Sequence, residues 1–135
     1  MAYNGYLLKV GNYVIDPKKY IAAESYQVTR NVQDLDSYRD ANGVLHRNAL
    51  AHAPIKVEFT TPAMMTNREV AEFMGNIRSQ TTNEIERKYT VEVYVPELDD
   101  YVTDDMYMPD PQFTIYGSYD NHLTYKATRI AFIGY

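Results

Sequence analysis

The chain contains no cysteine and no tryptophan, and none of its apolar runs reaches the ~18 residues that a membrane-spanning helix needs. Without cysteine, disulfide frameworks, thiol nucleophiles and cysteine-based zinc sites are excluded. The first residues also lack the basic stretch and the apolar core of a secretory signal peptide. We therefore expect a soluble protein with no membrane partner.

Positive charge is also scarce. The chain has 13 lysines and arginines and 18 acidic residues, which gives a formal net charge of -5 at pH 7. Residues 1–56 carry seven cations and five acids, a net charge of +2, whereas residues 57–135 carry six cations and thirteen acids, a net charge of -7. Because affinity for nucleic acid depends on neutralising phosphates, we expect no direct nucleic-acid binding from an acidic chain without a basic stripe.

Tyrosine is abundant, with 14 residues beside only four phenylalanines. Its large ring and polar tip favour half-exposed strands and interface patches, although tyrosine is also simply a good strand residue. The length of 135 residues fits one domain over 1–135, because a chain of this size buries roughly two thirds of the surface that its unfolded form exposes.

Alternation of apolar and polar residues predicts most of the secondary structure as strands. The turn pair Gly11-Asn12 separates two short apolar runs, which indicates a hairpin. In the run that begins at Ile85, every second residue is expected to face the core up to Val95. The expected strand segments are a hairpin over 6–15, strands over 25–31, 55–60 and 85–95, and a final hairpin from 113–116 and 123–133.

A single stretch has a convincing helical pattern. Thr66 and Glu69 have the spacing of a capping box, in which the two side chains satisfy the first free backbone N–H groups of a helix. The residues that follow place four apolar side chains on one face of about four turns, namely Val70, Phe73, Met74 and Ile77. Together with the strands, this predicts a mainly β fold: an antiparallel β-sandwich or barrel with one flanking helix.

Residues 33–52 are polar and can bury little apolar surface. Asp40-Ala41-Asn42-Gly43 is a strong turn signal within them, since Asn-Gly readily adopts positive φ. The segment is therefore expected to be either a long projecting hairpin or a mobile loop, and a connection of this length is usually functional or disordered.

The sequence contains no catalytic motif and no convincing metal site. His46, His52 and His122 have no zinc-ligand spacing. A calcium loop starting at Asp36 fails because Tyr38 stands where a second oxygen ligand is needed. The acids of 97–110 can be read as a cation site or a catalytic carboxylate pair, but a solvated acidic loop is favoured. Within this stretch only 101–102 and 106–108 are expected to be able to pair in a sheet. We therefore expect no cofactor, no metal and no enzymatic activity.

The string Arg39-Asp40-x-x-Gly43-x-x-His46-Arg47, followed by the alternating strand at 56–59, resembles small tail proteins of bacteriophages and prophages. The order of elements is similar to the tail-tube fold, which tail tubes, distal tail proteins and tail-completion proteins share. The resemblance implies a single tail-tube-like β-sandwich domain with a flanking helix and a long hairpin loop.

The resemblance implies that the protein is a structural component of a virion. Such a protein forms a ring, with a hexamer implied, at the distal end or baseplate of a tail or at the end of the tail tube. It docks to neighbouring tail proteins and is made in the cytoplasm of the bacterial host. Two alternatives remain open: a monomeric β-barrel that binds a small ligand, and a small hydrolase that uses the acids of 97–110.

The uneven charge suggests how such a ring is held together. A head-to-tail ring needs two different complementary surfaces on each subunit. We expect the 34–52 segment to be loose in a free subunit and to become ordered against the acidic run of an adjacent subunit. The candidate interface residues are Asp36, Arg39, Asp40, His46 and Arg47 on one side, and Asp99, Asp100, Asp104 and Asp105 on the other.

Overall fold

The computed structural model describes residues 3–30, 34–49, 51 and 54–135. Their main feature is a seven-stranded sheet in the order β2-β1-β8-β9-β12-β6-β3, in which each pair of neighbouring strands is antiparallel. The strands of this sheet are β1 (Leu8–Val10), β2 (Tyr13–Val14), β3 (Gln27–Arg30), β6 (Ile55–Thr60), β8 (Lys88–Val95), β9 (Asp100–Tyr107) and β12 (Arg129–Gly134).

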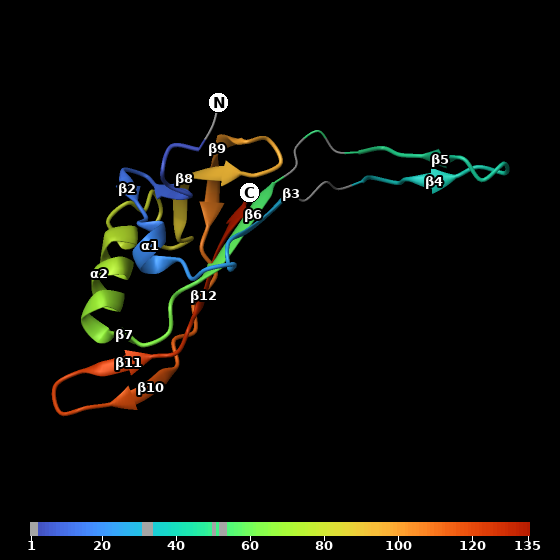
Figure 1. Ribbon diagram of the computed structural model, residues 1–135. Coiled ribbons are helices and arrows are strands. Elements are labelled where there is room, and N and C mark those ends of the chain that lie inside the picture. The colour runs from blue at the N-terminus through green and yellow to red at the C-terminus, as the bar shows by residue number, and fades with distance from the viewer. Residues whose placement is uncertain (1–2, 31–33, 50, 52–53) are drawn as a thin grey trace.

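Two smaller sheets accompany the large one. A three-stranded sheet has the order β10-β11-β7, and a two-stranded sheet pairs β4 with β5. Their strands are β7 (Met65–Thr66), β10 (Ile115–Ser118), β11 (Leu123–Tyr125), β4 (Tyr38–Arg39) and β5 (Leu45–His46). In Figure 1 the three-stranded sheet lies beyond the end of α2 (Asn67–Arg78), and the two-stranded sheet projects far from the rest of the chain.

The core lies on the face of the large sheet that α2 covers. Buried and half-buried residues alternate strictly along β6, and Val57 and Phe59 point inward, as their spacing predicts. Their cross-strand partners on β12 are Phe132 and Ile130, which are also buried. These inward-facing side chains join the buried face of α2 in one apolar cluster.

The large sheet curls, so that segments near its two ends meet. The Tyr26 side chain, next to the edge strand β3, donates a hydrogen bond from its hydroxyl to the Tyr94 carbonyl on β8, at 2.7 Å. Burial raises the pKa of the Tyr26 hydroxyl, which keeps it a neutral donor. The curled antiparallel sheet with its flanking helix confirms the predicted mainly β, sandwich-like fold.

The predicted helix is confirmed as α2. The Glu69 backbone N–H donates to the Thr66 hydroxyl at 3.3 Å, and the Thr66 N–H donates to the Glu69 carboxylate at 3.3 Å, which completes the capping box. Phe73 and Ile77 are fully buried, while Val70 and Met74 are half-buried. The expectation of a single helix is wrong, because one helical turn, α1 (Pro17–Tyr20), also forms after the N-cap Asp16. Proline fits the first turn of a helix, but the weak alternation of the residues around it did not predict a helix there.

Residues 34–49 form a long hairpin, the first of the two forms expected for the polar segment (Figure 1). The predicted turn is present, with the Gly43 N–H donating to the Asp40 carbonyl at 2.9 Å and Gly43 at a φ of +79°. His52 and the rest of 50–53, apart from Ala51, lie outside the described residues. We call residues 34–49 the projecting hairpin.

The expectation of a solvated acidic loop over 97–110 is wrong. Residues 100–107 form β9, which pairs with β8 along its whole length. On its other side β9 pairs with β12 at Met106 and Tyr107, and the Asp105 carbonyl accepts from the Tyr135 N–H at 3.3 Å. Residues 100–104 have no strand partner on that side within the described residues, so they form an open sheet edge. Charged side chains on an open edge oppose pairing with another chain, which is a structural reason for acids in a strand.

Two strand boundaries also differ from the prediction. β8 begins at Lys88, because Ile85 is 96% exposed and Arg87 has a φ of +54°, so the chain turns there. The run over 123–133 is divided between β11 and β12, which belong to different sheets. The hairpin formed by β10 and β11 is nevertheless present as predicted.

Candidate assembly surfaces

The projecting hairpin is held by polar contacts within itself. The Arg47 guanidinium binds the Asp34 carboxylate through two nitrogens, with Nη2 at 2.7 Å from Oδ1 and Nε at 3.1 Å from Oδ2. At the tip, Asp40 accepts hydrogen bonds from the backbone N–H groups of Asn42 and Val44, and its Oδ2 lies 2.9 Å from His46 Nε2. The hairpin therefore has internal order that the sequence did not reveal.

Two carboxylates of the hairpin are stabilised in their charged form. The Arg47 guanidinium holds the pKa of Asp34 below its usual value. The hydrogen bond from His46, together with that from the Val44 N–H, does the same for the pKa of Asp40. Both contacts stabilise the folded hairpin above the ordinary pKa of aspartate and are lost as the pH falls through the lowered values.

We expect carboxyl carbon NMR titration to give Asp34 and Asp40 midpoints below the ordinary value of about 3.9 for aspartate. Arg47→Gln should return the Asp34 midpoint toward the ordinary value of about 3.9 and leave the Asp40 midpoint unchanged, which makes Asp40 the internal control. Midpoints at the ordinary value for both Asp34 and Asp40 would contradict the ion pair and the tip geometry.

The hairpin also presents apolar side chains to solvent. Leu35, Tyr38, Val44 and Leu45 are 44–60% exposed, and the Tyr38 ring stacks on His46 with 4.9 Å between ring centres. Arg39 donates to the Gly43 carbonyl at 2.9 Å and forms no ion pair within the described residues. A projecting element that exposes apolar groups and a cation is suited to contact with another protein surface.

The predicted acidic surface has partners of its own. Asp99 accepts a hydrogen bond from the Tyr94 hydroxyl at 2.6 Å, and Asp105 accepts one from the Thr90 hydroxyl at 3.3 Å. Asp100 and Asp104 each accept from the backbone N–H of the next residue. No ion pair joins these acids to the projecting hairpin in the part of the chain that the structure describes, so the two groups of candidate residues remain separate.

The excess of tyrosine is partly explained by a cluster at one end of the large sheet. The Tyr6 and Tyr101 rings stack with 4.7 Å between ring centres, and Tyr94 packs edge-on against both Tyr101 and Tyr3. Hydrogen bonding of the Tyr6 hydroxyl to Glu92 raises the pKa of Tyr6 to about 12. Tyr94 on β8 and Tyr101 on β9 are the half-exposed strand rings that the composition predicts, whereas Tyr3 and Tyr6 precede the first strand.

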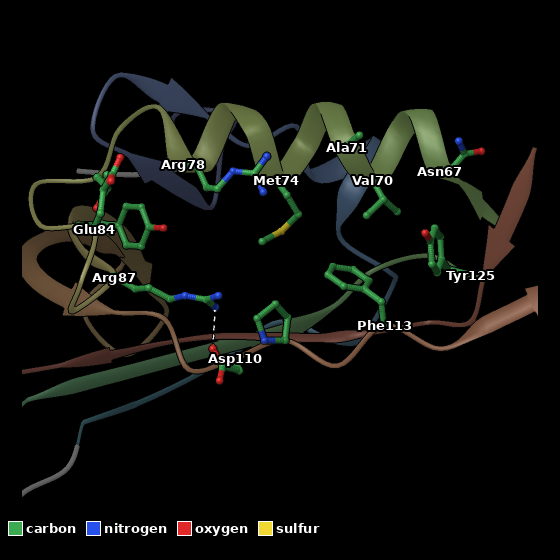
Figure 2. A pocket seen from close by; sticks show the side chains of 13 residues that line it. Asn67, Val70, Ala71, Met74, Arg78, Glu84, Arg87, Asp110, Phe113 and Tyr125 are labelled. Carbon is green, nitrogen blue, oxygen red and sulfur yellow. Dashed lines mark ion pairs between the residues drawn. The ribbon is translucent and has the colours of Figure 1, made fainter.

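A groove beside α2 was not predicted. It has a volume of about 850 Å³ and runs between α2, the turn before β8, and the segment that connects β9 to β10 (Figure 2). Figure 2 shows Val70 and Met74 directed from α2 toward the segment that carries Phe113. We call it the α2 groove; its lining residues are Asn67, Val70, Ala71, Met74, Arg78, Thr81, Glu84, Arg87, Tyr89, Asp110, Pro111, Phe113 and Tyr125.

One end of the α2 groove carries two guanidinium groups. Arg87 forms an ion pair with Asp110 at 2.9 Å, but the Asp110 side chain is 90% exposed. Arg78 has no ion pair or side-chain hydrogen bond within the described residues. Burial raises the pKa of the Tyr89 hydroxyl, and the two arginines partly offset this increase. The groove thus combines apolar walls with an end that favours a carboxylate.

Within the described ranges, no group of three or more His, Asp or Glu side chains is arranged to hold a metal ion. No described helix has the length and apolar character needed to cross a membrane.

Comparison with known proteins connects this fold to virus-like particles. The chain is similar to one from the tail of an empty gene transfer agent (GTA) particle with C6 symmetry, with a TM-score of 0.58, 12% identity, and coverage of 99% of this chain and 95% of that chain. It is also similar to a chain from the virion of a native GTA particle, with a TM-score of 0.56, 13% identity and the same coverage. The resemblance to phage tail proteins is thereby confirmed as a shared fold.

No curated protein matches the sequence. A family model described as a family of unknown function, DUF6711, matches residues 1–135. The chain therefore belongs to the DUF6711 family.

Proposed function

We propose that this protein is a structural component of a phage-like tail, built into the particle as a ring of identical subunits that docks to neighbouring tail proteins. The observation that carries the proposal is the fold, shared over 99% of this chain and 95% of a chain from a GTA tail. The C6 symmetry of that tail supports six subunits for the ring proposed here. The protein would act by assembly rather than by catalysis, within the virion, at the distal end or baseplate or at the end of the tube.

Ring formation requires that each subunit present two unlike surfaces. The projecting hairpin supplies one, because it extends beyond the large sheet and exposes apolar side chains and Arg39 (Figure 1). We propose that it contacts an adjacent subunit, with Asp36, Asp40, His46 and Arg47 shaping the hairpin. In this arrangement Arg39 is the cation available to meet the neighbour's acidic surface of Asp99, Asp100, Asp104 and Asp105, since Arg47 already binds Asp34.

The mass of the purified protein tests the proposal. Native mass spectrometry and light scattering should give an oligomer whose mass is a multiple of 15.6 kDa, with six copies expected. Replacing residues 36–47 by an Asn-Gly turn should abolish assembly and leave the domain folded, with a cooperative thermal transition, because within the described residues the two hairpin strands pair only with each other. Arg39→Glu should weaken assembly more than Arg39→Lys does.

Two results would contradict parts of this proposal. A wild-type protein that stays monomeric at high concentration would contradict ring formation. A shortened variant that assembles to the wild-type mass would contradict the role of the hairpin and leave the ring intact.

A small-ligand binder is the second candidate. The volume of the α2 groove falls in the range of about 300–1,000 Å³ that is typical of small-molecule sites. The sequence suggested a ligand site inside a β-barrel. The groove instead lies on the flank of the sheet, so a ligand would bind there. A monomer that copurifies with a bound small molecule would favour this candidate.

A further inference from the structure

We propose that the α2 groove receives the β8–β9 turn of a second copy of this chain, with Leu98 inserted between the apolar walls and the Glu97 carboxylate beside the groove arginines. The inference rests on the proposed ring and deepens it by naming one subunit contact.

The β8–β9 turn displays an apolar side chain between acids. Leu98 is 49% exposed and stands between Glu97 and Asp99. The Leu98 N–H donates to the Val95 carbonyl at 3.1 Å, and the Asp99 N–H donates to the Pro96 carbonyl at 3.2 Å. The turn is therefore fixed before binding, so little conformational entropy is lost when it docks.

The α2 groove is complementary to this turn in both polarity and charge. Val70, Met74 and Phe113 offer apolar walls for the leucine side chain. Arg78 lacks an acidic partner within the described residues, as does Glu97. Bringing the two together forms a charge-assisted contact without breaking an existing one.

Arg87 can join the same contact at little cost. Its pair with Asp110 is solvent-exposed, and exposed ion pairs of this kind contribute little to stability. A carboxylate of the incoming turn can share or replace Asp110 without leaving a buried charge unpaired.

The position of the two features requires that they belong to different copies. The groove lies near Arg87 and Tyr89 at the start of β8, and the turn follows the last residue of β8. Eight residues of strand separate them by roughly 26 Å at ~3.3 Å per residue. Figure 1 shows the turn on the side of the sheet away from α2. A chain therefore cannot fill its own groove, and the contact joins two copies. In the proposed ring each copy gives its turn to one neighbour and receives the turn of the other, which is a head-to-tail contact.

Two other exposed apolar residues stand between acids, and neither fits as well. Ile85 follows Glu84, which itself lines the groove, so Ile85 belongs to the receiving side. Leu35 stands between Asp34, which Arg47 binds, and Asp36, but it lies along the stem of the projecting hairpin and not at a tight turn. Leu98 is the one of the three that combines exposure, a fixed turn and an adjacent unpaired carboxylate.

Engineered cysteines test the contact directly, because the chain has none of its own. Ala71→Cys places a thiol on the groove wall, and Asp100→Cys places one beside the turn, with Leu98, Glu97 and Arg78 left intact. The two variants are mixed and oxidised with glutathione disulfide, and cross-linked dimer is quantified by gel. A mixture of Ala71→Cys with Tyr116→Cys, an exposed site on β10, is the matched control. We expect at least about tenfold more dimer from the first mixture, because docking raises the effective thiol concentration.

Second-site changes tie any cross-link to the proposed contacts. Leu98→Ala in the turn partner should reduce the cross-link about tenfold, whereas Val14→Ala, a similarly exposed residue on β2, should not. Arg78→Glu in the groove partner should also reduce it, and Glu97→Lys in the turn partner should restore it. A chain carrying both cysteines should give a ladder of multimers, as a head-to-tail contact requires.

The outcomes separate this inference from the proposed ring. Assembly to a multiple of 15.6 kDa without this cross-link would overturn the groove contact and leave the ring standing. Absence of both assembly and cross-link would overturn both. A double-cysteine chain that stops at dimers would overturn the head-to-tail geometry, and a cross-link insensitive to Leu98 and Arg78 would overturn the assigned occupant.

Discussion

Replacing Phe73 by alanine is expected to lower the free energy of unfolding by about 3–5 kcal/mol, the usual cost of truncating a buried phenylalanine. Phe73 is 1% exposed, stacks on Tyr20 with 4.5 Å between ring centres, and meets Phe59 edge-on at 6.4 Å. It therefore joins α2 to α1 and to β6. Because these three elements are fixed by other contacts, they cannot collapse fully into the space that the ring leaves.

Val70→Ala is the matched control for this change. Val70 lies one turn earlier on α2, is only half-buried and lines the groove, so its truncation should cost clearly less than that of Phe73. Denaturant unfolding followed by circular dichroism measures both costs, provided that the slope with denaturant is unchanged. Equal costs for the two variants would mean that α2 does not pack through the Phe73 face.

The helix and the central strands could be predicted because their signals are local. The capping box needs only Thr66 and Glu69, and the buried face of α2 follows from the spacing of Phe73 and Ile77. The alternation of apolar and polar residues along β6 is likewise enough to predict which of its side chains are buried. In each case the contacts within a few residues and the burial in the core favour the same structure.

The acidic strand could be predicted only in part: its apolar residues at 101–102 and 106–108 indicate pairing, but the continuous strand β9 was not expected. Its charges suggest solvation, yet Val102 and Met106 pair with Val93 and Tyr89 of β8 and place one side of β9 on the core. The pairing with β8 overrides the local preference against strand. Only knowledge of the partner strand would have revealed that these acids mark an open edge.

In the candidate surfaces, too, local features could be predicted and contacts between distant residues could not. The turn of the projecting hairpin was readable from Asp40 to Gly43, whereas the ion pair between Asp34 and Arg47 joins residues 13 apart across the hairpin. The α2 groove is assembled from α2, the turn before β8, and the segments around Phe113 and Tyr125. No local pattern brings those segments together, so the groove was invisible in the sequence.

Gly134→Ala is expected to lower the free energy of unfolding by about 1–3 kcal/mol, as overpacking of a tight site does. A Cβ atom at Gly134 would lie 2.9 Å from the Ile55 nitrogen, 3.1 Å from the Ile55 carbonyl oxygen and 3.2 Å from the Pro54 Cβ. The nearest two atoms belong to the backbone of the neighbouring strand β6, which cannot rotate away as a side chain would. Relief therefore requires β12 and β6 to separate locally.

Gly75→Ala is the matched control and should act in the opposite direction. Gly75 lies within α2, where a Cβ would meet only the Arg78 Nη2 atom at 4.0 Å, an ordinary contact. Alanine there restricts the unfolded chain without strain and should raise the free energy of unfolding by about 0.5–1 kcal/mol. The same substitution should thus destabilise the chain at the sheet and stabilise it in the helix, as measured by denaturant unfolding. The substitution is the same at both sites, so opposite effects can come only from the different surroundings of the two glycines. If both variants shift the midpoint in the same direction, β12 does not approach β6 as closely at Gly134 as the structure shows.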